Sequence, residues 1–231
     1  MKYFFLIFSF LVSLNAMSQQ EENVEIDSQD IDYSYFYFPN TKISKSSLSF
    51  YFGLGLPYTS GTLTDYFKRK LDLTMSLDYY HYNNLTFSFS IMYADGYLKR
   101  DINANNKLWT PNDTLSFTAY GLSAGYSVLN TVHWRINPFG GLALIQPELA
   151  SSNGDKYKIG LRLSPVIGLN FSYRFINVKK EMQKSKYSGA SNCFGINARI
   201  AYVPFAVREK KVPFSGGIWY MTIGITPINI F

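Results

Sequence analysis

A strict alternation of apolar and polar residues runs through residues 71–79 and constrains the fold more than any other stretch. Leucine, methionine and tyrosine occupy the odd positions, whereas aspartate, threonine and serine occupy the even ones. Successive side chains of a strand point to opposite faces, so a period of two predicts a strand with one apolar and one polar face. The fold must therefore give each face of this strand a different environment.

The same alternation recurs along the chain, in stretches separated by polar or turn-forming segments. Eight strands are expected, at residues 47–56, 70–80, 85–93, 114–128, 132–145, 157–175, 194–202 and 216–231. Most of them reach the roughly 9–11 residues that a tilted strand needs to cross a bilayer. Short connections between consecutive strands predict an all-β fold, an antiparallel up-and-down barrel.

Some segments depart from the simple pattern. The apolar residues of 114–128 change parity, which predicts a β-bulge near Thr118 and Ala119. Pro165 falls inside a strand, where its missing N–H would break the ladder, so a bulge is expected there too. Residues 95–113 and 146–156 are polar and are expected to be long loops.

The composition of the two faces indicates which of them meets lipid. The polar faces hold serine, threonine, glycine and asparagine with isolated charges, and only 16% of all residues are charged. A soluble domain usually has about 25% charged residues. Small polar residues suit the crowded interior of an eight-stranded barrel, and apolar faces with aromatic ends suit a bilayer. A soluble ligand-binding barrel, with the apolar face inside, is the competing interpretation.

The amino-terminal region differs from the rest of the chain. Lys2 followed by an apolar run and small residues is typical of a signal peptide over residues 1–18, with cleavage expected between Ser18 and Gln19. Residues 19–45 form an acidic and aromatic arm, which either folds on the domain or docks on a periplasmic protein partner. The barrel is expected over residues 46–231. An export signal argues against nucleic acid as a partner.

In lipid, a sheet must close so that no strand edge is left unpaired. The final strand ends on Phe231, and a terminal aromatic residue on an amphipathic strand resembles the signal read by the barrel insertion machinery of the outer membrane. The chain thus resembles the small, about eight-stranded outer-membrane β-barrel proteins of Gram-negative bacteria. Pro227 and Asn229 depart from that pattern, because they occupy positions in phase with Phe231 where apolar residues are usual.

The resemblance places both chain ends in the periplasm, and this topology sorts the charged residues into two groups. One is a lumen charge network, since buried charges must be paired or neutralised: Asp72, Asp78, Arg162, Arg174 and Arg199. The other consists of basic residues of the outer loops, which are expected to meet lipopolysaccharide phosphates: Lys68, Arg69, Lys99, Arg100, Lys210 and Lys211.

The expected function is a structural or protein-interaction role in the cell envelope, with the lumen plugged by side chains. A narrow porin-like channel for small or apolar solutes is an alternative, and a lipid-modifying enzyme is a third. An enzyme would need a Ser/His/acid set at the outer rim, but His81 and His133 both fall at the periplasmic end. No catalytic, cofactor-binding or metal-ligating residue is therefore expected, and Cys193 is expected to be a buried, inert thiol.

Overall fold

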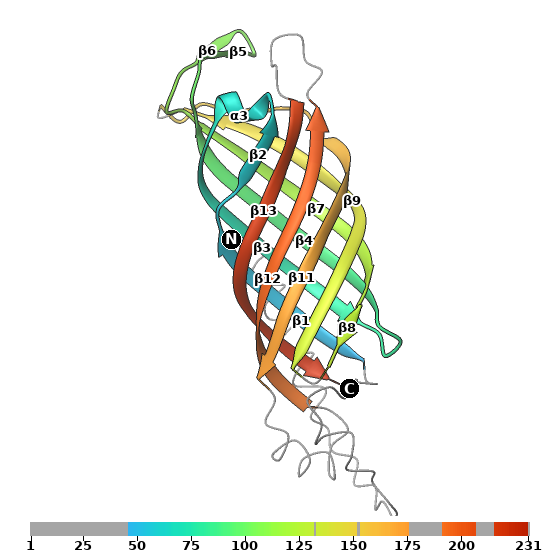
Figure 1. The fold of residues 1–231 in the computed structure, drawn as a ribbon. Helices are drawn as coiled ribbons and strands as arrows, with labels where there is room; N and C mark the ends of the chain where they lie inside the picture. Colours follow the sequence, from blue (N-terminus) through green and yellow to red (C-terminus); the bar gives the residue numbers. More distant parts are fainter. Residues whose placement is uncertain (1–45, 132, 152, 176–190, 207–214, 231) are drawn as a thin grey trace, which may run out of the picture.

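The computed structural model describes residues 46–131, 133–151, 153–175, 191–206 and 215–230. Eight long antiparallel strands form a tilted barrel, which closes because the first strand pairs with the last (Figure 1). In barrel order the strands are β1 (Ser47–Gly55), β3 (Phe67–Tyr80), β4 (Leu85–Leu98), β7 (Thr114–Tyr126), β9 (Trp134–Ala150), β11 (Arg162–Phe175), β12 (Ser191–Ala206) and β13 (Ser215–Ile230). The predicted fold class is confirmed, and a strand is present at each of the eight predicted places. The strand predicted over residues 157–175 is divided, because a short strand at Lys156–Lys158 ends before β11 begins at Arg162.

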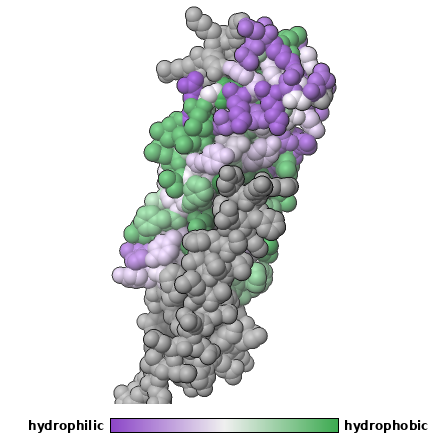
Figure 2. Space-filling view, turned by 180° about the vertical axis from the view of Figure 1, so that it is seen from behind, coloured by the Kyte–Doolittle hydropathy of each residue, from purple (hydrophilic) through white to green (hydrophobic). Residues whose placement is uncertain are grey.

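The apolar residues of the alternating pattern face outward along the wall. Leu122 and Ile223 are each 67% exposed, whereas Asp72 and Asp78 are fully buried on the inner face. In Figure 2, apolar residues predominate on the part of the barrel wall that is coloured, and hydrophilic residues gather at the upper end. A continuous apolar outer surface of this kind is stable only against lipid. The orientation predicted for residues 71–79 is therefore confirmed. The competing interpretation, a soluble barrel whose apolar face lines a ligand site, is not confirmed.

The bulge predicted at Thr118 and Ala119 is wrong. The register between β4 and β7 is continuous from Leu85↔Tyr126 to Tyr97↔Thr114. Leu115 and Phe117 are buried because they point into the barrel, as their parity requires. The change of pattern marks a change in what fills the interior. A register shift does occur in β3, between Arg69 and Leu71.

Pro165 does not require a bulge either. Its strand, β11, pairs without interruption with β9, including Pro165↔Leu142. The ladder between β11 and β12 begins only at Ile167↔Tyr202, although both strands continue beyond that point. Pro165 therefore lies where no ladder partner on β12 needs its N–H. The Ser164 hydroxyl donates to the carbonyl of Pro204 across this opening.

Short elements gather at the barrel end that the predicted topology places outside, here called the outer end, with the opposite end called the periplasmic end. These elements are β2 (Tyr58–Gly61), the four-residue helix α3 (Leu63–Tyr66), the hairpin of β5 (Ile102–Ala104) and β6 (Lys107–Trp109), and β10 (Lys156–Lys158). Strand β2 pairs with β13 and β10 with β9, and the hairpin β5–β6 lies above the mouth (Figure 1). At the periplasmic end, β8 (Leu129–Asn130) pairs with β9. The loops predicted at 95–113 and 146–156 are shorter in the structure, because β4 continues to Leu98 and β9 to Ala150. In the described residues, no helix is long and apolar enough to cross a membrane.

Candidate functional site in the barrel interior

The barrel interior is divided into a polar half at the periplasmic end and an apolar half at the outer end. The polar half is lined by small hydroxyl side chains, asparagines and arginines, all buried: Ser47, Ser49, Ser76, Asp78, Thr86, Ser88, Ser90, Ser123, Arg135, Asn137, Asn170, Ser172, Arg174, Asn197, Arg199, Thr222 and Thr226. The three arginines lie on the adjacent strands β9, β11 and β12. Asp78 lies across the barrel on β3. The two walls of this half therefore carry opposite charge.

Asp78 and Arg199 form the one ion pair that the described part of the barrel interior contains. Their Oδ1 and Nη1 atoms are 3.6 Å apart, and both side chains are buried. Ser76 Oγ donates to the other carboxylate oxygen at 3.0 Å. The Arg199 guanidinium also lies over the ring of Phe139, 4.6 Å from its centroid. A buried ion pair held this way has a fixed geometry, which favours one arrangement of the surrounding strands.

Asp72 has a different partner from the one expected of a lumen carboxylate. Its Oδ2 accepts the backbone N–H of Met221 on β13 at 2.7 Å. The ladder between β1 and β13 ends at Gly55↔Thr222, because β1 stops before Pro57. Asp72 reaches from β3 past the end of β1 and satisfies a main-chain donor that has lost its ladder partner. It closes a gap in the wall.

Arg174 and Arg162 occupy separate places. Arg174 is fully buried near the periplasmic end, where its Nη2 donates to Asn130 Oδ1 at 3.1 Å and to the carbonyl of Thr131. Arg162 is half-buried at the outer end of β11. Of the five charges predicted to form one lumen network, only Asp78 and Arg199 contact each other in the structure. A single network of all five stays a prediction.

The sequence prediction missed Arg135. This side chain is 3% exposed and packs over the ring of Tyr80, with its Cζ 3.6 Å from the centroid. Parity would have found it, since Trp134 and Ile136 face outward and the residue between them must face inward.

The outer half of the interior is filled by apolar side chains in contact with one another. They come from most of the strands and from the elements above them: Leu63, Phe67, Met92, Leu98, Ile102, Trp109, Leu115, Phe117, Ile145, Leu149, Ile159, Val166, Val203, Phe205, Ile218 and Tyr220. Phe117 is central, with ring centroids 5.6 Å from Phe67 and 5.3 Å from Phe205. This half is packed like the core of a soluble protein.

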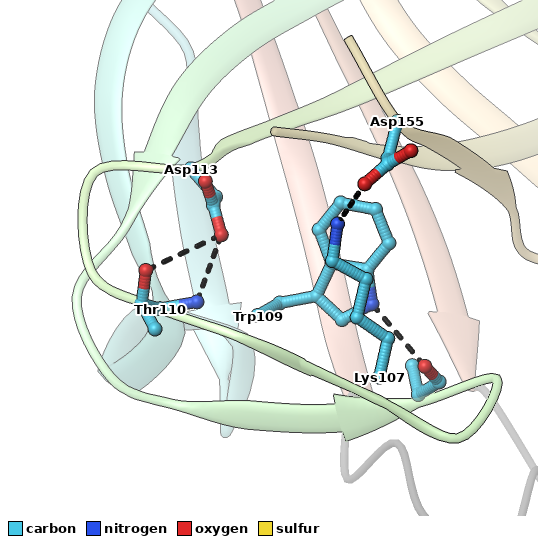
Figure 3. A network of polar contacts seen from close by, with 6 residues as sticks. Lys107, Trp109, Thr110, Asp113 and Asp155 are labelled. Atoms are coloured by element: carbon cyan, nitrogen blue, oxygen red, sulfur yellow. Dashed lines mark hydrogen bonds and ion pairs between the residues drawn. The ribbon is translucent and has the colours of Figure 1, made fainter. Parts of the chain in front are cut away.

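The hairpin β5–β6 covers the outer mouth. Trp109 is 2% exposed, and its Nε1 donates to the carbonyl of Ala104 at 3.2 Å. The Lys107 ammonium lies 4.8 Å from the centroid of the Trp109 ring and pairs with Asp155 from the neighbouring connection (Figure 3). Asp113 Oδ2 accepts the backbone N–H of Thr110 at 2.8 Å. These contacts hold the tryptophan over the apolar half.

Basic residues are exposed at the outer rim. Lys68 and Arg69 lie on β3, outside the predicted loop, and the register shift that follows lets three consecutive basic side chains face outward. Arg69 lies over the ring of Tyr58, 4.5 Å from its centroid. Lys99 and Arg100 are exposed after β4, and Lys99 Nζ donates to the carbonyl of Thr64 at 2.7 Å. The predicted sites at Lys210, Lys211 and Phe231, the signal peptide and the amino-terminal arm lie outside the described residues.

Neither histidine lies at the outer rim. His133 Nδ1 donates to the carbonyl of Arg174 at 3.1 Å, and its ring stacks on Tyr173. His81 Nδ1 donates to Asn83 Oδ1 at 2.7 Å in the turn between β3 and β4. Both therefore have structural partners in the periplasmic turns. Cys193 is buried near the start of β12.

A closed antiparallel barrel with an apolar outer belt and an interior filled by side chains is a small transmembrane β-barrel of the outer-membrane type. Solved structures of this kind resemble the chain in fold. The match with the crystal structure of Neisserial surface protein A (NspA) spans 79% of this chain and 96% of the NspA chain, at 12% identity and a TM-score of 0.49.

Two further solved structures show the same level of similarity. Ail, the attachment invasion locus protein of Yersinia pestis, in complex with the heparin analogue sucrose octasulfate, covers 80% of this chain and 97% of its own, at 15% identity and a TM-score of 0.39. The match with the outer membrane protein AlkL in DMPC lipid bilayers spans 91% of this chain and 97% of the AlkL chain, at 12% identity and a TM-score of 0.43. No protein-family profile and no curated protein matches the chain. At these identities the likeness concerns the fold alone.

Proposed function

We propose that the protein is a non-conducting barrel of a Gram-negative outer membrane, with a structural or protein-interaction role in the cell envelope. The observation that carries this proposal is the packed apolar outer half of the interior. Ions cross a barrel through water, and apolar surroundings offer water no hydrogen-bond partners. The Phe67–Phe117–Phe205 contacts stand across the route that an ion would take. The function then belongs to the surfaces of the barrel.

Conductance in planar lipid bilayers tests this proposal. The wild-type protein is expected to give no stable current steps. A Phe117→Gly/Phe205→Gly variant removes two central rings and is expected to give small, flickering steps if it folds. Leu122→Gly on the lipid-facing side of β7 is the matched control and should stay silent. A stable open state of the wild-type protein would contradict a plugged barrel.

The partner proposed for the outer rim is lipopolysaccharide. Lys68, Arg69 and Lys70 form an outward-facing basic triplet near the outer end of β3, and guanidinium and ammonium groups bind phosphate strongly. Co-purified lipopolysaccharide should fall at least twofold in a Lys68→Gln/Arg69→Gln variant. Lys156→Gln/Lys158→Gln on β10 is the control. Equal lipid content in all three proteins would contradict the proposal.

Export and insertion complete this proposal. Signal peptide cleavage between Ser18 and Gln19 would leave a mature protein that begins at Gln19, which amino-terminal sequencing tests. Recognition of Phe231 by the barrel insertion machinery predicts less protein in the outer membrane for Phe231→Ala than for Phe175→Ala. The arm at residues 19–45 is proposed to contact a periplasmic protein, and its deletion tests that contact by co-purification.

A second candidate function is passage of apolar solutes between the bilayer and the barrel interior. The open ladder between β11 and β12 favours it, because Val166 and Val203 of the apolar half border that opening. Pro165 and Pro204 each lack an N–H there. A Pro165→Val/Pro204→Val variant restores both donors and is expected to slow uptake of an apolar fluorescent probe in cells. If cells with the wild-type protein, cells with the variant and cells without the protein take up the probe at the same rate, this candidate is excluded.

A further inference from the structure

Arg135 and Arg174 form a buried cationic pair at the periplasmic end of the interior. They are 3% and 0% exposed. Both donate to the same neutral acceptor, Asn130 Oδ1, at 3.3 Å from Arg135 Nε and 3.1 Å from Arg174 Nη2. Two like charges this close repel each other, and burial removes the water that would otherwise screen them. The pair is unfavourable unless something negative lies beside it.

Apart from a longer-range attraction between the Asp78 carboxylate and Arg135, the remaining contacts of the pair supply no negative charge. Arg135 packs on Tyr80, and its Nη2 is 3.5 Å from Ser47 Oγ. Arg174 Nη2 also donates to the carbonyl of Thr131. Across the described residues the ion pairs are Lys70–Asp95, Lys107–Asp155 and Arg199–Asp78, so neither arginine of the pair has a carboxylate within ion-pair distance. The carboxylate that attracts Arg135, Asp78, is already paired with Arg199.

Donors without acceptors surround the pair. Arg174 Nε and Nη1 are buried and have no hydrogen-bond partner within the described part of the chain. Asn137 Nδ2, two residues along β9 from Arg135 and on the same inner face, also lacks an acceptor. An arginine N–H that loses water without gaining an acceptor costs more than an ordinary unmade hydrogen bond. This side of the interior therefore has positive charge in excess, together with unpaired donors on Arg174.

Arg199 shows what a charge-balanced arginine looks like in the same barrel, although its own Nε, Nη1 and Nη2 also lack hydrogen-bond partners among the described residues. Its charge is answered by Asp78 across the lumen, whereas the Arg135–Arg174 pair has only Asn130 in common. The pair also lies close to the periplasm, since the backbone N–H of Arg174 donates to the carbonyl of His133 in the turn before β9. An anion from the periplasmic side would have the shorter route to it.

We propose that the Arg135–Arg174 pair binds an oxyanion, a phosphate or carboxylate group that accepts the free N–H groups of Arg174. The group comes either from a small periplasmic anion or from the chain's own acidic amino-terminal arm, which contains Glu21, Glu22, Glu25, Asp27, Asp30 and Asp32. Both sources have the same chemistry, because guanidinium binds carboxylate and phosphate in similar geometry.

Thermal unfolding of the full mature protein in detergent tests the proposal, with inorganic phosphate as the probe and sodium chloride of equal ionic strength as the reference. A ligand that binds only the folded state raises the unfolding temperature. The variants are Arg174→Gln and Arg135→Gln, with Arg162→Gln as the matched control. A further variant changes the six acids of the arm to their amides.

Each outcome identifies a source or overturns the proposal. For a small anion, phosphate raises the unfolding temperature of the wild-type protein by ~3 °C or more. Arg174→Gln and Arg135→Gln lose this rise, and Arg162→Gln keeps it. For the arm, phosphate has no effect on the wild-type protein, whereas the six-amide variant unfolds earlier and phosphate restores it. If phosphate stabilises neither protein, or stabilises Arg174→Gln as much as the wild type, the site does not exist.

Discussion

The two halves of the barrel interior have the same lipid-facing exterior but are built by different forces. Around Phe117 the interior is filled by apolar side chains, whose contacts are individually weak and need no particular direction. Around Asp78 and Arg199 it is filled by charges and hydrogen-bonding groups, which are stable only when each finds its partner. The bilayer therefore determines the outer face of every strand and leaves the inner face free to vary. Measurements on each half should differ accordingly.

The largest effect is expected in the apolar half. Phe117→Ala removes a fully buried ring and should lower the free energy of unfolding by about 4 kcal/mol, since a cavity is left among close-packed neighbours. Urea titration of the protein in phospholipid vesicles, followed by tryptophan fluorescence, measures it. Leu122→Ala, which faces lipid on the same strand, should cost less than half as much. Equal losses at the two positions would mean that the apolar half is loosely packed.

In the polar half, the cost should depend on which partner is left. Arg199→Met leaves the buried Asp78 carboxylate without its ion-pair partner and should lower the free energy of unfolding by about 3 kcal/mol. Adding Asp78→Leu removes the unpaired carboxylate charge and should recover most of the lost free energy of unfolding. The double-mutant cycle in the same vesicles gives the coupling energy. Strictly additive effects would show that the two groups do not interact.

How far the sequence predicted this arrangement follows from the same contrast. The eight strands and the inward orientation of Asp72 were predictable, because lipid imposes apolar residues on every outer position. The parity change after Phe117 was misinterpreted as a bulge, because an apolar inner face looks like a slipped outer one in a single sequence. Pairing with the neighbouring strand, which depends on residues far away in the chain, separates the two explanations.

The site was less predictable, for a physical reason. That Asp72 caps the N–H of Met221 depends on where β1 ends relative to β3 and β13, and this stagger is a property of the closed barrel. Arg135 carried a readable signal in its parity, but its closeness to Arg174 through Asn130 brings together β8, β9 and β11. Alternation gives a residue's face. It does not give its partner across the lumen.

Asp72 lies at the boundary between the halves and should show an intermediate effect. Asp72→Ala leaves the backbone N–H of Met221 without an acceptor, which should lower the free energy of unfolding by about 2 kcal/mol. Asp72→Asn keeps an oxygen in that place and should cost less than about 1 kcal/mol, because the N–H can still donate to it. If the amide variant loses as much as alanine, the charge of Asp72 matters more than its hydrogen bond.

The smallest effect is expected at the hairpin β5–β6, where a polar contact holds an apolar one in place. Lys107 is half-buried and Asp155 is exposed, so breaking their ion pair with Lys107→Met should change the free energy of global unfolding by less than about 1 kcal/mol. The same variant should roughly double the rate at which protease cleaves the exposed turn of the hairpin, because Trp109 is then less firmly held over the mouth. Asp65→Asn in α3 is the exposed-charge control for both measurements. A global loss as large as that of Phe117→Ala would mean that the cap unfolds together with the apolar half, and the two would then be one cooperative unit closed by a salt bridge.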